Sequence, residues 1–151
     1  MIKMNKMNKI LAILALFIIG CVKSEKEILP CNLQIDDGIS YTDGKVFKGT
    51  CNILYEGEYL WKTLTYKRGK LHKEIGYYVP EGSIEYIGYR DRDGKIHGDF
   101  QRFFKNGDIE IEGTFSRSYY TGDWKYYNEA GEMYRKMVYD KAGMVLDSIT
   151  Y

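Results

Sequence analysis

Residues 94–131 read GKIHGDFQRFFKNGDIEIEGTFSRSYYTGDWKYYNEAG. Turn signals stand in this stretch at Gly94, Gly107, Ser118 and Gly131, so one recurs every 11 to 13 residues. The intervals between them are rich in aromatic and β-branched residues, which favour strands. Asn106-Gly107 is a strong hairpin signal, because a type I′ turn needs positive φ at both central residues. The stretch therefore predicts antiparallel strands joined by tight turns.

The same turn signals recur along most of the chain in two interleaved series. The first series stands at Gly44, Gly69, Gly94, Ser118 and Gly143, and the second at Gly57, Gly82, Gly107 and Gly131. The spacing within each series is 24 or 25 residues, and such a fixed period marks a repeat architecture. No interval carries a sustained helical pattern of apolar residues. The sequence thus predicts an all-β fold: an elongated antiparallel β-meander of about four tandem two-stranded repeats with a 24–25-residue period, plus a terminal half-repeat.

Positions aligned by turn predict which side chains share a face. Six residues after the first-series turns stand Thr50, Ile75, Phe100 and Trp124, at an even offset that points to one face of a strand. Odd offsets after the second-series turns are mostly polar or acidic. We therefore expect one buried and one wet face. Neighbouring hairpins must supply the cover, because a single hairpin cannot bury its apolar face alone.

Two segments, residues 94–107 and 118–131, carry a resemblance to a known family. Each has a turn residue, a Gly four positions later, an aromatic residue two positions after that Gly, an aromatic pair and a closing Gly. This pattern resembles the variant MORN repeat of bacteria, and the resemblance covers about residues 41–151. It is looser in the second unit, where Lys73 and Glu74 occupy the region of the mid-unit Gly. The resemblance implies an elongated antiparallel sheet used for interaction, in a family that includes exported proteins and some antitoxins.

The amino terminus has the layout of a secretory signal. Lys3, Lys6 and Lys9 precede an apolar run at residues 10–19, which is shorter than the roughly 20 residues that span a bilayer. The run ends in Ile-Ile-Gly before Cys21, which resembles the lipobox of bacterial lipoproteins. That resemblance implies cleavage before Cys21 and lipid attachment to its thiol. An uncleaved signal anchor, or a cleaved peptide without lipid, remains open.

The predicted organisation follows from this signal. We expect a lipoprotein signal peptide at residues 1–20, a membrane-proximal leader at 21–40 and the repeat domain at 41–151. The lipid would hold the protein on the cell membrane or the outer membrane, facing the periplasm or the surface. Residues 21–151 contain 19 Lys and Arg against 21 Asp and Glu, a net charge of −2. This near-neutral balance gives no electrostatic case for nucleic acid or for a polybasic membrane patch.

Two cysteines remain once Cys21 is assigned to lipid. Cys31 and Cys51 lie twenty positions apart in a chain that we expect to be exported. An oxidising compartment favours a disulfide between them, which would stabilise the fold by roughly 3 kcal/mol. The alternative is a pair of free, half-buried thiols.

No catalytic motif stands out in the sequence. It has no Gly-x-Ser-x-Gly elbow, phosphate loop or zinc motif. His72 and His97 share one repeat position, three residues after Gly69 and Gly94, and are either stacked ligands or repeated surface residues. Two thiols and these distant histidines offer too few ligands for a metal. We therefore expect no enzymatic activity, no metal and no cofactor.

Aromatic residues make up 15% of the chain and include several adjacent pairs, such as Tyr126-Tyr127. One member of each pair should point away from the other. This predicts an exposed aromatic binding strip of Tyr78, Phe103, Trp124 and Tyr126, with a thin two-sided core as the alternative. We accordingly expect a membrane-anchored protein-interaction or scaffold module with an unknown protein partner. The alternatives are an immunity or antitoxin-like protein that neutralises a toxin, and a glycan-binding surface protein.

Overall fold

The computed structural model describes residues 30–151. A short 3-10 helix, η1 (Pro30–Asn32), leads into a small sheet of β1 (Gln34–Asp36), β2 (Ile39–Thr42) and β3 (Lys45–Val46). A nine-stranded sheet follows, made of β4 (Gly49–Tyr55), β5 (Tyr59–Lys67), β6 (Lys70–Tyr77), β7 (Ile84–Tyr89), β8 (Gly98–Phe103), β9 (Ile109–Ser116), β10 (Tyr119–Tyr127), β11 (Met133–Tyr139) and β12 (Val145–Thr150).

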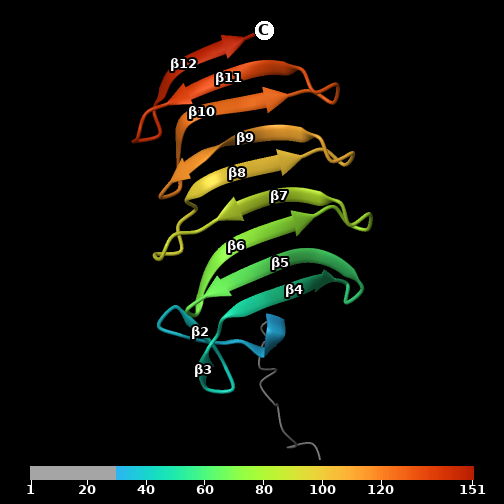
Figure 1. Ribbon diagram of the computed structural model, residues 1–151, viewed down its shortest axis with the longest axis vertical. Coiled ribbons are helices and arrows are strands. Elements are labelled where there is room, and N and C mark those ends of the chain that lie inside the picture. Colours follow the sequence, from blue (N-terminus) through green and yellow to red (C-terminus); the bar gives the residue numbers. More distant parts are fainter. Residues whose placement is uncertain (1–29) are drawn as a thin grey trace, which may run out of the picture.

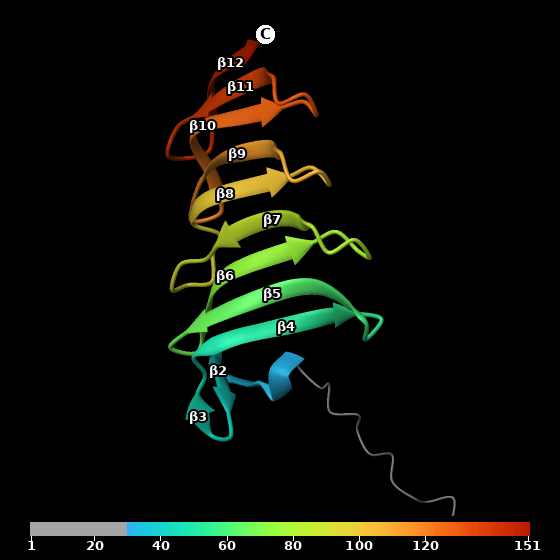
Figure 2. The same ribbon diagram turned by 45° about the vertical axis from the view of Figure 1, so that its right-hand side comes forward.

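The nine strands are hydrogen-bonded in sequence order, and every pair is antiparallel. Figures 1 and 2 show the resulting elongated, twisted ladder, in which each strand touches only its neighbours in the chain. Four hairpins and the single strand β12 make up the sheet. This arrangement confirms the predicted all-β meander of four two-stranded repeats and a half-repeat. Among residues 30–151, no helix has the length and apolar character needed to cross a bilayer.

The register shifts by one residue at a recurring place in the sheet. Irregularities lie at Ile53/Leu54, Gly76/Tyr77, Arg102/Phe103 and Tyr126/Tyr127, which are 23 to 26 residues apart. Such bulges increase the local twist of a strand pair. Each lies near the end of the first strand of its hairpin, so the twist of the ladder in Figure 2 is built into every repeat.

The small sheet packs against the turn between β5 and β6. Gly69 in that turn donates its N–H to the carbonyl of Phe47 and accepts a bond from Ser40 N–H, both at 2.7 Å. Gly69 is buried and has a φ of 73°, and a Cβ there would collide with the Ile39 side chain. Glycine is therefore required for both the turn and the close approach. The expected boundary between residues 40 and 41 falls inside β2, so the small sheet spans it.

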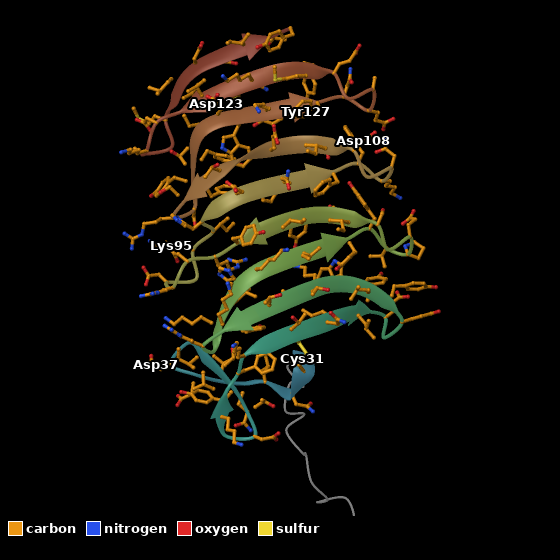
Figure 3. All side chains as sticks on the ribbon, viewed as in Figure 1. Cys31, Asp37, Lys95, Asp108, Asp123 and Tyr127 are labelled. Carbon is orange, nitrogen blue, oxygen red and sulfur yellow. A yellow bond between two sulfur atoms is a disulfide. The ribbon has the colours of Figure 1, made fainter. Side chains whose placement is uncertain are left out.

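Cys31 and Cys51 form the predicted disulfide, with their Cα atoms 5.8 Å apart. Cys51 is fully buried in β4, the first strand of the large sheet, and Cys31 belongs to η1. The bond therefore fastens η1 across the edge of the sheet, as the lower part of Figure 3 shows. The predicted signal peptide and lipid-bearing Cys21 lie outside the described residues.

The large sheet is a single layer. Within residues 30–151, the hydrophobic side chains classed as buried are those of Leu33, Cys51 and Trp124. A sheet covered by a second layer would bury a whole row of side chains. Stabilisation comes instead from contacts between side chains of neighbouring strands on the same face.

Candidate interaction surfaces

One side of the large sheet, the aromatic face, carries a continuous row of rings. Its members are Tyr86, Phe100, Phe115, Tyr120, Trp124 and Tyr139. Consecutive ring centroids lie 4.5 to 6.4 Å apart, in both stacked and edge-on geometries. Aromatic pairs at these separations stabilise by roughly 0.5–1.5 kcal/mol each beyond their area burial. This row is the thin core of the repeat sheet.

Glycines on the neighbouring strand make room for these rings. A Cβ on Gly113 would strike the indole of Trp124, and one on Gly76 would strike the ring of Tyr86. Trp124 is 2% exposed, and its indole N–H donates to the Thr114 carbonyl at 3.2 Å. The rings of Trp124 and Tyr86 thus lie over the backbone of the adjacent strand at Gly113 and Gly76. They shield this backbone from solvent in the absence of a second layer.

A charged cluster continues the aromatic face toward the N-terminal end of the sheet. The Glu74 carboxylate accepts bonds from Lys62 at 2.9 Å, Tyr86 at 2.6 Å and Arg90 at 3.2 Å. Burial raises the pKa of Glu74, but these hydrogen bonds and the charge of Lys62 outweigh it and hold the pKa below its ordinary value. The carboxylate is therefore ionised and fully engaged, which makes it a structural crosslink of β5, β6 and β7.

The opposite side, the polar face, is organised around Glu112 in β9. Its carboxylate accepts hydrogen bonds from Lys125 and from the Tyr127 hydroxyl, each at 2.9 Å. The bond from Lys125, supported by that from Tyr127 and by the lysine charge, outweighs burial and lowers the pKa of Glu112. Asp123 pairs with Lys136 at 2.6 Å on the next strand pair. Cross-strand ion pairs thus hold polar side chains in fixed positions on this face.

An open groove of about 780 Å³ runs along the polar face across β6 to β10. Its lining includes acidic, basic and neutral polar side chains beside the apolar Ile87; among the polar ones are Tyr89, Asp99, Gln101, Glu112, Thr114 and Lys125. Because strand side chains alternate, these groups project from one side of the sheet at the spacing of neighbouring strands. The groove is a preformed surface for hydrogen bonding, and the ion pairs within it fix the orientation of its charged members.

The four residues of the predicted aromatic strip lie in different settings. Trp124 is buried on the aromatic face, so its ring serves packing. Tyr126 lies on the same face, half-buried, with Tyr134 6.5 Å away and Arg135 over its ring. Burial, with Tyr139 and Tyr120 nearby, raises the pKa of Tyr126 to about 12.

The other two members of the strip are joined near the ends of their strands. The hydroxyl of Tyr78 donates to the Phe103 carbonyl at 2.8 Å, across one 25-residue repeat. Both side chains are half-buried. This hydrogen bond links successive repeats, as does the ion pair between Lys105 and Glu81, which are 24 residues apart.

The two histidines come near the groove but differ in environment. His72 is half-buried and packs edge-on against Tyr89, with ring centroids 6.0 Å apart, whereas His97 is exposed. Both line the groove of the polar face. In the described part of the chain, no three His, Cys, Asp or Glu side chains gather closely enough to hold a metal ion.

The binding site predicted from the sequence was an aromatic strip, and it did not include the polar face. The signal for this face is the paired tyrosines: Tyr126 packs on the aromatic face, while the hydroxyl of Tyr127 bonds Glu112 on the polar face. The prediction that adjacent aromatic residues point to opposite sides therefore holds for this pair. The tyrosine pair alone does not identify Glu112 as the partner of Tyr127, because that pairing depends on the register between β9 and β10.

The fold defines an all-β protein built as a repeat-like antiparallel β-meander. No protein-family model matches the chain, and no curated protein matches it. Among solved structures, it is similar to one described as the crystal structure of the GtfA/B complex bound to UDP and GlcNAc, at 11% identity and a TM-score of 0.36. The match covers 59% of this chain and 22% of that one, so the likeness extends over a small part of that protein.

Proposed function

We propose that this protein is a lipid-anchored envelope protein that acts as a protein-interaction module through its repeat sheet, of the variant MORN kind. Cys21 would carry the lipid and the leader would tether the sheet. The observation that carries the proposal is the openness of the sheet: a single layer presents both faces, and its polar face holds a preformed groove. A repeat sheet of this kind offers much more surface than a globular domain of the same length.

The polar face is the better candidate for partner contact. The groups in its groove are held by cross-strand bonds, such as those from Lys125 and Tyr127 to Glu112. Groups that are fixed before binding lose less conformational entropy when a partner arrives. The aromatic face, by contrast, uses its largest ring, that of Trp124, for its own packing.

The length of chain between Cys21 and the first described residue suits a tether. Pro30, the first described residue, stands nine positions after Cys21. A fully extended chain of that length reaches about 30 Å at most. The repeat sheet would therefore remain close to the bilayer while its faces stay accessible to soluble or membrane partners.

Crosslinking in envelope preparations tests the interaction. The double variant Asp99→Ala, Gln101→Ala changes two groove residues, and Glu58→Ala, Glu129→Ala changes two exposed acidic residues in turns away from the groove. We expect one specific crosslinked partner with the unaltered protein and the turn variant, and at least a tenfold loss with the groove variant. Equal crosslinking by all three proteins, or substrate turnover by the purified protein, would contradict the proposal.

Metabolic labelling with a fatty acid tests the anchor separately. The unaltered chain should incorporate the label and sediment with membranes, and Cys21→Ala should lose the label. Because Cys21 is outside the disulfide, the variant should keep the Cys31–Cys51 bond, which a thiol-reactive reagent can verify under denaturing conditions. Labelling of the Cys21→Ala chain would disprove lipid attachment at this residue.

A further inference from the structure

The meander sorts its charges between two edges. Every second connection of the large sheet lies on the same edge, because consecutive strands run in opposite directions. We call basic edge the four connections with their flanking strand residues at 67–70, 89–98, 116–119 and 139–145. Its cations are Lys67, Arg68, Lys70, Arg90, Arg92, Lys95, Arg117 and Lys141. Against these eight stand three aspartates, so the basic edge has a net charge of +5.

The opposite edge has the reverse charge. We call acidic edge the connections and flanking residues at 55–59, 77–84, 103–109 and 127–133. Its anions are Glu56, Glu58, Glu81, Asp108, Glu129 and Glu132. Lys105 is its one cation, which leaves a net charge of −5. Figure 3 shows Lys95 and Asp108 at opposite ends of the strands.

Several cations of the basic edge have their charged groups free. Within residues 30–151, no side-chain hydrogen bond or ion pair engages the ammonium groups of Lys67 and Lys95 or the guanidinium of Arg68, and all three residues are exposed. Lys67 and Arg68 line a hollow of about 710 Å³ between the β5–β6 turn and the β7–β8 connection, together with Lys70 and Arg92. Lys95 stands in the same β7–β8 connection, three residues after Arg92. The Lys70 ammonium donates to the Arg92 carbonyl at 2.6 Å and so ties the two turns together.

The two edges are far enough apart to act independently. The strands between them have six to nine residues, or roughly 20–30 Å at about 3.3 Å per residue. The Debye length at physiological ionic strength is about 8 Å, so an anion at one edge hardly senses the other. The net charge of −2 that gave no reason to expect a membrane patch is therefore an average over two edges of opposite sign.

We propose that the basic edge lies against the anionic phospholipid surface of the membrane, with lipid phosphates next to Lys67, Arg68, Lys95 and their neighbours. The proposal deepens the proposed function, because it rests on anchoring through Cys21. It gives the anchored sheet a definite orientation, on its basic edge with the acidic edge turned away. Both faces of the sheet, including the groove, then stand upright and open to partners.

The anchored end of the molecule favours a bilayer over other anionic partners. The β5–β6 turn contacts the small sheet through Gly69, so the basic edge begins beside the small sheet, which contains the last residues of the leader. A tether of at most about 30 Å keeps this edge at high effective concentration next to the lipid surface. Even weak attraction per cation then suffices to orient the sheet, because binding has become intramolecular.

Lysine footprinting of the full lipidated chain tests the orientation. The protein is reconstituted into phosphatidylcholine vesicles with and without phosphatidylglycerol, treated with a water-soluble amine reagent and read by mass spectrometry. We expect phosphatidylglycerol to reduce modification of Lys67, Lys70, Lys95 and Lys141 several-fold and to leave Lys105 unchanged, with reversal at high salt. The mass of the Cys21 peptide in the same digest reports the lipid, so a failed anchor and a failed orientation give different results.

Matched variants sharpen the test. Lys67→Gln, Arg68→Gln, Lys95→Gln removes three free cations, and Glu56→Gln, Glu58→Gln, Glu129→Gln removes three exposed anions of the acidic edge. Each cation near an anionic surface raises the binding constant roughly fivefold. Lys70 and Lys141 of the first variant should therefore lose their protection from the amine reagent, while those of the second variant keep it. Equal modification in both kinds of vesicle would overturn the proposal. Protection of Lys105 by phosphatidylglycerol would also overturn it. So would protection in the absence of vesicles that increases with protein concentration, because it would show that the edges of two copies pair.

Discussion

At Gly113 the absence of a side chain decides whether Trp124 can pack. Its backbone φ suits any residue, so the obstacle to substitution is the indole ring, which a Cβ would strike. Gly113→Ala should therefore destabilise the protein by about 1–3 kcal/mol through overpacking. Gly88→Ala is the matched control, because its Cβ would meet Phe100 at an ordinary 3.6 Å. Urea unfolding should show a lower midpoint for Gly113→Ala and an unchanged or slightly higher one for Gly88→Ala; equal losses would contradict the packing model.

The Glu74 carboxylate makes the stability of the sheet depend on pH. Its folded pKa lies below the unfolded value near 4.5, so its contribution is complete above that value and is lost as the pH falls through the folded pKa. Glu74→Gln should cost about 1–3 kcal/mol at pH 7, since it removes a charged partner of Lys62 and Arg90. The cost should shrink in acid, where Glu74 is protonated anyway.

Urea unfolding of both proteins at neutral pH and below pH 4 measures this effect. Glu81→Gln serves as a control, because the Glu81–Lys105 pair lies at the exposed surface and its loss should leave the midpoint unchanged. A Glu74→Gln penalty that stays constant with pH would show that the carboxylate contributes through its shape or hydrogen bonds rather than through its charge.

Which face a residue occupies was predicted only in part. Phe100 and Trp124, at the same offset in the third and fourth units, do lie together, with ring centroids 5.9 Å apart. Ile75, at the same offset in the second unit, lies opposite, because its neighbour Gly76 is the residue that faces the ring of Tyr86. Four residues after the first-series turn, Gly98 and Gly122 have a positive φ in the third and fourth units, whereas Lys73 of the second unit does not. One irregular residue changes the register, and each register step turns every later side chain to the other face.

At the scale of elements, the disulfide acts on one end of the sheet. It joins η1 to β4, which lies at the end of the large sheet and is hydrogen-bonded there to β5. The variant Cys31→Ser, Cys51→Ser should lose roughly 3 kcal/mol, the loop-closure contribution for a twenty-residue separation. Because each strand contacts only its neighbours, we expect the loss to be local.

Amide hydrogen exchange can locate this loss. Exchange should accelerate at residues 49–67, in β4 and β5, and remain nearly unchanged at residues 119–139, in β10 and β11. Uniform acceleration along the sheet would contradict the local model and indicate that the nine strands unfold as one unit.

At the scale of the whole molecule, the turn series alone was sufficient to predict the architecture. Tight turns depend on a few local residues, and the 24–25-residue period fixes how many hairpins follow one another. The type I′ geometry expected at Asn106-Gly107 is not formed, because only Gly107 has a positive φ there, whereas Glu56-Gly57 and Arg68-Gly69 have a positive φ at both positions. The charge segregation was equally present in the sequence. It could not be seen from the net charge, because it appears only when charges are summed over alternate turns. The polar groove depends on strand register and twist, which the turn spacing leaves undetermined.

A ladder of this kind should be most stable where its ring contacts are densest. Phe100, Phe115 and Trp124 lie in mutual contact across β8, β9 and β10, with centroids 4.9 to 5.9 Å apart. All side chains of β12, in contrast, are exposed. Native-state hydrogen exchange should therefore give the highest opening free energies at residues 98–127 and the lowest at 145–150, because opening in a nearest-neighbour sheet starts where least area is buried. Trp124→Phe should lower protection most in β9 and β10, whereas equal protection in all nine strands would mean that contacts along the sheet, rather than the ring cluster, set its stability.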